Sequence, residues 1–346
     1  AQGHLTLGWI RLQREHYEPN KNWLEKADNS FTTAEQLTES QTQQELSAAI
    51  QLNKGHTLYA LGKTDEAFNA FLARELNQTP FQNKLNELVF REFFARTSLR
   101  EEEYDVGIDM AKAAAAIAKE LPEQPRYASN LALVGALFLL NQDLNSALEW
   151  FEKAENIFRQ QEQYAFCIPL LRDKVLIHRR LNNYNEAIKD LDDLLNLLDS
   201  GYKPSISPAG NSSLFTHVVE IEVDPENISR AIYGFTKEQE EEIANAMSTH
   251  IWLEQGDLQK AGKFNRKRIL LLEDAFKDSS GHRIKREYLF ALNDSALLNI
   301  KLNEFHDAWK NWEKALAFAF QHNFWNECIV ILESLNALWA RYPQER

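Results

Sequence analysis

The chain has 346 residues, and its 38 Lys and Arg against 51 Asp and Glu give a net charge of −13. So acidic a chain does not coat nucleic acid or an anionic membrane through its overall field, although a local basic patch would still do so. The 12 glycines and eight valines are too few for a sandwich, a barrel or a doubly wound sheet. The composition therefore predicts an all-α protein.

The same helical frame recurs along the chain. In its clearest copy, Gly135 is followed after seven residues by Gln142 at a turn, and then by Leu144, Ala147 and the large Phe151. Small residues let two helices approach closely, and a large residue fills the space between successive pairs. The frame predicts a helical hairpin. In chain order, we place the small residue of the second helix at Asn20, Ala67, Gly107, Ala147, Ala187, Ala261 and Ala308.

The spacing of these seven positions is 47, 40, 40, 40, 74 and 47 residues. In the first copy Asn20 replaces the small residue, between Gly8 and Ala27. The frame resembles the tetratricopeptide repeat (TPR) family over nearly the whole chain. The family's usual period is 34 residues, and the longer period of about 40 is similar to that of large bacterial regulators. The resemblance implies an all-α, right-handed superhelical solenoid of about seven helix-turn-helix repeats.

The gap of 74 residues indicates an insert. Residues 200–213 are rich in Gly, Pro, Ser and Asn, which predicts a loop. Val219, Ile221 and Val223 then alternate with glutamates, which predicts a short half-buried strand. We predict repeats 1–5 in residues 1–199, the insert in 200–236, and repeats 6–7 with a capping helix in 237–346. The insert is interpreted either as ordered decoration or as a lid or docking strand.

The C-terminal end carries one more helix, predicted over residues 326–342 and interpreted as a solvating cap. Aromatic residues fall at helical spacing near it. We expect them to pack in the core, with a partner-facing patch as the alternative. They are Trp309, Trp312, Phe318, Phe320 and Trp325.

Catalytic and metal-binding motifs are missing from the sequence. It has no Gly-rich phosphate loop, HExxH, EF-hand loop or GxSxG. Cys167 and Cys328 share no metal-ligand spacing and are expected to be buried and unpaired. The acidic run 238–242 opens a helix, where it suits the macrodipole, and is interpreted as a solvated face. We therefore expect no enzyme activity in this chain, no cofactor and no metal.

The sequence also bears on membrane spanning, on the ends of the chain and on its cellular compartment. The longest apolar run, residues 131–140, is too short to span a bilayer. No signal-peptide pattern is visible. Because the chain starts at Ala1 without Met, we interpret it as a fragment or processed form of something longer. Two unpaired cysteines fit the cytoplasm, with the periplasm as the alternative.

The resemblance also implies where a partner binds, because in the family the first helix of each repeat lines a concave groove. Guanidinium groups there would suit a carboxylate or phosphate. The alternative is that the arginines pair locally, for example Arg96 with Glu92 and Arg172 with Asp173. The Lys and Asn set of the family's chaperone-tail clamp is not found. The predicted groove residues are Trp9, His56, Tyr59, Glu92, Arg96, Arg100, Arg172, Leu176, Arg179, His250, Asn293 and Lys301.

The resemblance thus implies a non-catalytic module that binds a protein or peptide, with acidic groups as favoured chemistry and nucleic acid as a disfavoured partner. We expect a scaffold or the sensory part of a larger, bacterial regulatory protein. One alternative is a domain that senses a small ligand or signal peptide and controls an attached output domain. Another is the non-catalytic region of an enzyme whose catalytic domain lies outside these residues.

Overall fold

The computed structural model describes residues 1–17, 22–38, 44–76, 80–81, 84–121, 124–200, 237–278 and 281–341. This part of the chain forms fifteen α-helices and no strand, which confirms the all-α prediction. The loop and the strand predicted in the insert lie outside the described residues. The helices are α1 (Gln2–Tyr17), α2 (Trp23–Gln36), α3 (Gln44–Ala60), α4 (Thr64–Leu76), α5 (Lys84–Arg100), α6 (Tyr104–Lys119), α7 (Gln124–Leu140), α8 (Leu144–Gln160), α9 (Tyr164–Arg180), α10 (Tyr184–Asp199), α11 (Lys237–Glu254), α12 (Leu258–Asp278), α13 (His282–Lys301), α14 (Phe305–Gln321) and α15 (Trp325–Arg341).

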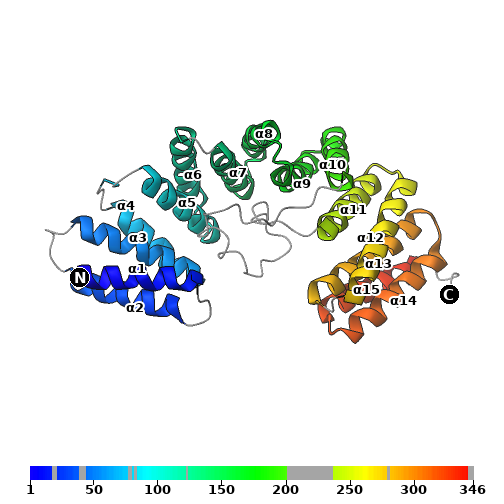
Figure 1. Ribbon diagram of the computed structural model, residues 1–346. Helices are drawn as coiled ribbons and strands as arrows, with labels where there is room; N and C mark the ends of the chain where they lie inside the picture. Colours follow the sequence, from blue (N-terminus) through cyan, green and yellow to red (C-terminus); the bar gives the residue numbers. More distant parts are fainter. Residues whose placement is uncertain are drawn as a thin grey trace. The chain divides into compact units, whose positions relative to one another are not determined.

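The chain divides into two compact units, and the boundary between Leu170 and Leu171 falls inside α9. Within each unit the helices form hairpins stacked in chain order (Figure 1). Successive helices pack on one another from α1 to α8 in one unit and from α10 to α15 in the other. The first helices of successive hairpins also touch, as α3 and α5 do in one unit and α11 and α13 in the other. Contacts confined to near neighbours define a solenoid, so the repeat architecture is confirmed. The predicted division at residues 199 and 237 stays a prediction.

Five of the hairpin turns reverse the chain through the same backbone hydrogen bond. Lys63 donates its N–H to the carbonyl of Leu58, and Asp143 donates to Phe138, both at 2.9 Å. These bonds cap the last carbonyls of the first helix and require a left-handed residue at the turn. Such a residue, with φ between 55° and 78°, stands five positions before the small residue of each second helix. The seven are Asn22, Gly62, Glu102, Gln142, Asn182, Gly256 and Asn303.

The small residues fit closely against aromatic rings of the paired helix. A Cβ added to Gly135 of α7 would lie 2.6 Å from the ring of Phe151 of α8. A Cβ on Gly55 of α3 would meet Phe71 of α4 at 2.5 Å. The small second-helix residues are fully buried, as predicted. They include Ala67, Ala147, Ala187, Ala261 and Ala308.

The first hairpin differs from the prediction by one residue assignment. Gly8 of α1 meets the ring of Phe31, at 2.5 Å from an added Cβ. Because the ring stands four residues after the small residue, the small position is the fully buried Ala27 and not Asn20. The spacing from Ala27 to Ala67 is 40 residues, so the first five hairpins share one period.

The last helix, α15, is present as predicted, but it is not a solvating cap. Its outward face carries Trp325, Ile329 and Leu332, which are 52%, 56% and 50% exposed. Of the aromatic residues near this end, Trp312 is buried in the core, whereas Phe320 and Trp325 are exposed and pack edge-to-face on each other. For these two rings the structure therefore favours the alternative, a partner-facing patch, over a place in the core.

Candidate functional site

In the N-terminal unit, predicted groove residues of α3 and α5 meet around one aromatic ring. The ring of Phe93 lies 4.5 Å from that of His56 and 5.5 Å from that of Tyr59. The guanidinium of Arg100 lies over the Tyr59 ring at 4.6 Å, which is a cation–π distance. Tyr59 itself is buried, so its ring supports Arg100 and is not an open wall of a groove. We call His56, Tyr59, Phe93 and Arg100 the α3–α5 cluster.

Two members of the α3–α5 cluster have unused bonding capacity. Among the described residues, no carboxylate forms an ion pair with Arg100. His56 has a buried Nε2 atom without a hydrogen-bond partner in that same part of the chain. Burial lowers the pKa of His56 to about 4, so the imidazole is neutral at pH 7. The partly exposed Arg100 guanidinium offers one positive charge and hydrogen-bond donors to a ligand.

Glu92, in contrast, is buried and fully engaged. It accepts two hydrogen bonds from Arg126, at 3.0 and 2.7 Å, and one from Asn130 at 2.7 Å. Arg126 and Asn130 belong to α7, so this network joins the first helices of two successive hairpins. Neither partner is evident from the sequence, because both stand more than thirty residues from Glu92. Arg96 is partly buried on the same helix.

In the C-terminal unit, the predicted arginines of α9 bind carboxylates of α11. Arg172 is buried, and its Nη1 donates to both oxygens of Glu240 at 2.9 and 3.1 Å, whereas Asp173 lies at 3.8 Å. Arg179 donates to Glu254 through its Nε at 3.0 and 3.1 Å. These charges are neutralised within the protein, which leaves them poorly placed to attract an anion.

The acidic run 238–242 was predicted to be a solvated face, and this prediction is wrong. Glu240 and Glu242 are both buried. Glu242 accepts from Arg268 of α12 at 2.7 Å, and Arg268 also bonds Glu287 at 2.7 Å and Asp294 at 3.0 Å. Burial raises the pKa of Glu242. The three carboxylates hold the pKa of Arg268 above its ordinary value although burial acts in the opposite direction.

The remaining predicted residues lie apart from these pairs. His250 contacts Asp294 at 3.2 Å and is partly exposed. Trp9 and Lys301 are exposed, and Leu176 is half-buried. Asn293 accepts a hydrogen bond from the indole of Trp312 at 2.9 Å, which fixes its amide group.

Asn293 also lines a pocket of about 270 Å³ between α13 and α15. The walls are mainly apolar, from Leu289 and Phe290 on one helix and Val330 and Ile331 on the other. Arg286 of α13 binds Glu327 of α15 at 2.9 Å beside them, and Asn326 completes the lining. The sequence signal for this pocket was Asn293 alone, because α15 was expected to be a polar cap. We call it the α13–α15 pocket.

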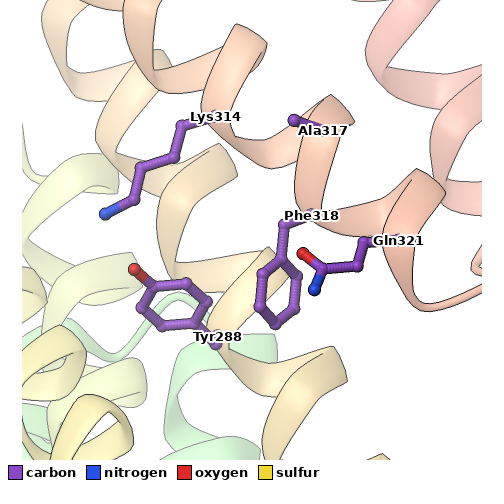
Figure 2. Close-up of a pocket in the computed structure, with 5 residues that line it drawn as sticks. All are labelled: Tyr288, Lys314, Ala317, Phe318 and Gln321. Atoms are coloured by element: carbon purple, nitrogen blue, oxygen red, sulfur yellow. The ribbon is translucent and has the colours of Figure 1, made fainter.

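A second pocket, of about 340 Å³, opens between α13 and α14 (Figure 2). Figure 2 shows the Lys314 ammonium and the Tyr288 hydroxyl pointing toward one another, with Phe318 and Gln321 alongside. Tyr288 donates to Glu273 at 2.9 Å, and Lys314 lies 3.8 Å from the same carboxylate. Because the polar atoms of Tyr288 and Lys314 already have partners, this pocket is the weaker candidate for a ligand site.

Other kinds of site are not found in the part of the chain that the structure describes. No group of three or more His, Cys, Asp or Glu side chains is arranged to hold a metal ion. None of the described helices combines the length and the apolar character needed to cross a bilayer. Cys167 and Cys328 are both buried, as predicted.

Comparison with known proteins places the fold. No family model matches the chain, and no curated protein matches it. Among solved structures, the apo form of RapI is 12% identical with a TM-score of 0.62, covering 92% of this chain and 75% of RapI. Aspartyl phosphate phosphatase F from Bacillus subtilis is 12% identical with a TM-score of 0.56, covering 95% and 88%. The apo quorum sensor NprR from B. thuringiensis is 14% identical with a TM-score of 0.55, covering 99% and 81%.

This chain has the same helical-repeat fold. The TPR-type resemblance is thereby confirmed at the level of architecture. Sequence identities this low carry no information about a shared ligand or activity, so function has to be argued from the surfaces of this chain.

Proposed function

We propose that the chain is a non-catalytic binding module that holds a peptide or protein segment against the first helices of its repeats. The observation that carries the proposal is the α13–α15 pocket, which is open, mainly apolar and built on two first helices. Its apolar wall would bury a side chain of the partner, and Asn293 and Arg286 would bond the partner's backbone or polar groups.

The size of the α13–α15 pocket favours a peptide over a metabolite. Pockets for small molecules measure about 300–1,000 Å³ and enclose most of the ligand. The volume here is about 270 Å³, enough for one large apolar side chain of a longer partner. The indole N–H of Trp312 donates a hydrogen bond to the side-chain oxygen of Asn293. The amide nitrogen of Asn293 is therefore left as a donor for a peptide carbonyl.

The α3–α5 cluster supports a finer proposal, that the partner carries an acidic group. Arg100 is a cation without a carboxylate partner in the described part of its unit, and its ring contact with Tyr59 holds it in place. A carboxylate or phosphate of the partner would form a charge-assisted hydrogen bond with it. Arg172 and Arg179 do not add to this proposal, because α11 carboxylates already bind them.

The second candidate function is sensing, in which a bound signal peptide or small ligand controls an attached output domain. One structure that shares the fold is named a quorum sensor, and another is named a phosphatase. A stack of hairpins joined by near-neighbour contacts suits such a role, because a ligand that favours one packing of neighbouring repeats shifts the population of that packing. An attached enzyme domain and a cytoplasmic location also stay proposals.

A peptide selection tests the proposed function. Random twelve-residue peptides displayed on phage are selected on the purified chain, and enriched peptides are measured by fluorescence anisotropy. We expect enriched peptides to carry a large apolar residue and to bind with micromolar affinity. Val330→Trp fills the α13–α15 pocket and should weaken binding at least tenfold, about 1.4 kcal/mol.

The matched control is Gln321→Trp, which places the same side chain at the pocket of Figure 2 and should leave binding unchanged. If no peptide is enriched over the bare support, or if Val330→Trp binds every enriched peptide as tightly as the original chain, the proposal is wrong.

A further inference from the structure

The outward face of α15 matches a face that the other first helices bury. Both α9 and α15 have 17 residues and begin two positions after a left-handed residue, Glu162 and Asn323 respectively. They therefore align residue by residue. The residues of α9 at this face, Ile168, Leu171 and Val175, are at most 2% exposed. Their counterparts on α15 are Ile329, Leu332 and Asn336, and all three are exposed.

In a complete hairpin this face is covered by the second helix. On α13 the matching residues are Leu289, Leu292 and Ala296, which are buried, and α14 packs on α13. No second helix follows α15 in the described residues. An antiparallel helix is thus the shape that fits this face, because the second helix of each hairpin runs antiparallel to the first.

The spacing of the exposed residues is nearly the same in both directions. Trp325 and Trp339 stand seven positions before and after Leu332, and Ile329 and Asn336 stand three before and four after it. These positions share one face of the helix. We call them the α15 stripe. The Trp339 ring is 40% exposed and also stacks on Trp309 of α14 at 4.8 Å. If a second α15 is turned end for end, Trp325 meets the exposed part of the other chain's Trp339, and Leu332 meets its own copy.

We propose that the α15 stripe pairs with the α15 stripe of a second copy of this chain, antiparallel about a two-fold axis near Leu332. This is the isologous contact that a closed dimer requires. Phe320 of α14 extends the surface, because its ring packs edge-to-face on Trp325 at 5.0 Å. The proposal does not depend on the α13–α15 pocket, which involves Val330 on another face of the helix.

The exposed area is sufficient for a weak dimer. Side chains of this size carry about 150–250 Å² each, so the half-exposed stripe with Phe320 offers roughly 500–600 Å² per chain. A pair then buries about 1,000–1,200 Å², at the lower edge of stable interfaces. We therefore expect a dissociation constant in the micromolar range.

Electrostatics gives the dimer a characteristic salt dependence. Each copy carries a net charge of −13, and Glu333, which is exposed and follows Leu332, would approach its own copy in the proposed dimer. Like charges at this distance oppose pairing and are screened by salt. The dimer should therefore strengthen between 50 mM and 500 mM salt, and Glu333→Gln should strengthen it at low salt. A neutral or basic partner helix would not show this behaviour.

Sedimentation of the whole chain tests the proposal. The monomer mass is 40.1 kDa. We expect twice that mass at high micromolar concentration, and 40.1 kDa for Leu332→Glu at the same concentration. Val330→Glu is the matched control, because it puts the same charge on an exposed, neighbouring face of α15 and should leave the dimer intact. A monomer at every concentration and salt, or a dimer that survives Leu332→Glu, would overturn the proposal.

A cysteine at the axis gives a second test. Leu332→Cys should form a disulfide-linked dimer under mild oxidation, because each new thiol faces its own copy. The native Cys167 and Cys328 are buried, so the original chain should stay uncrosslinked. Crosslinking that is no faster than that of a cysteine at exposed Gln321 would contradict the two-fold axis.

Discussion

Asp173 shows how one buried carboxyl ties the stability of the C-terminal unit to pH. Its Oδ2 atom is buried without a hydrogen-bond partner in the described part of the chain, and Arg172 lies 3.8 Å from its Oδ1. Burial raises the pKa of Asp173 to about 7, although Arg172 acts to lower it. The folded protein therefore holds this proton at pH values where the unfolded chain, with an ordinary pKa near 4, has lost it.

The sign of the pH effect follows directly. Between pH 4 and 7 the folded state binds more protons than the unfolded state, so the contribution of Asp173 to stability falls as pH rises through this window. Asp173→Asn removes the charge and should stabilise the protein at pH 8 by on the order of 2 kcal/mol, with no gain at pH 4. Urea unfolding at both pH values measures this. Equal effects of the substitution at the two pH values would contradict the assignment.

At the scale of the element, the repeat frame was predictable from the sequence because it rests on residue size. Gly55, Gly135 and the small residues of the second helices are required by close helix packing, and such packing depends on local spacing alone. Only in the first hairpin was the small residue of the second helix predicted wrongly. Residue identity alone does not show that this turn ends later than predicted, or that Phe31 is the ring that Gly8 meets. Left-handed Glu102 was also missed, because glutamate rarely takes that conformation.

The buried polar pairs between elements were not predictable in the same way. Glu92 with Arg126, and Arg172 with Glu240, occupy the same two repeat positions with their charges exchanged. In both cases the sequence alone shows an exposed-looking charge on an amphipathic helix. Whether it is buried depends on the next first helix, and that helix is fixed only when the hairpins stack. The α13–α15 pocket was missed for the same reason, apart from Asn293.

Glycine substitutions test the packing of these elements. Gly135→Ala places a Cβ 2.6 Å from the Phe151 ring and should destabilise the chain by about 1–3 kcal/mol. Gly262→Ala is the matched control, because Gly262 lies in α12 with open space around its Cα. It should stabilise the helix by about 0.5–1 kcal/mol. Thermal unfolding followed by circular dichroism measures both, and a neutral Gly135→Ala would show that this contact is not tight.

At the scale of the whole molecule, the chain forms two stacks of hairpins whose first helices carry the candidate binding surfaces. In the N-terminal unit the surface is the α3–α5 cluster with Arg100, and in the C-terminal unit it is the α13–α15 pocket. The net charge of −13 bears on partners as well. A charge of this sign repels nucleic acid over most of the surface, and the acidic partner group proposed above would meet a local positive charge at Arg100. The α15 stripe adds a surface for a second copy.

The most direct test of the binding proposal is methyl NMR of the chain with a selected peptide. Leu289, Val330 and Ile331 line the α13–α15 pocket and carry methyl groups, and Val330 is one of only eight valines, which simplifies its assignment. The account predicts that the methyl signals of these three residues move on peptide addition and saturate with the affinity measured by anisotropy. If these signals stay in place while methyl signals elsewhere in the chain move, the peptide binds at another site and the account is contradicted.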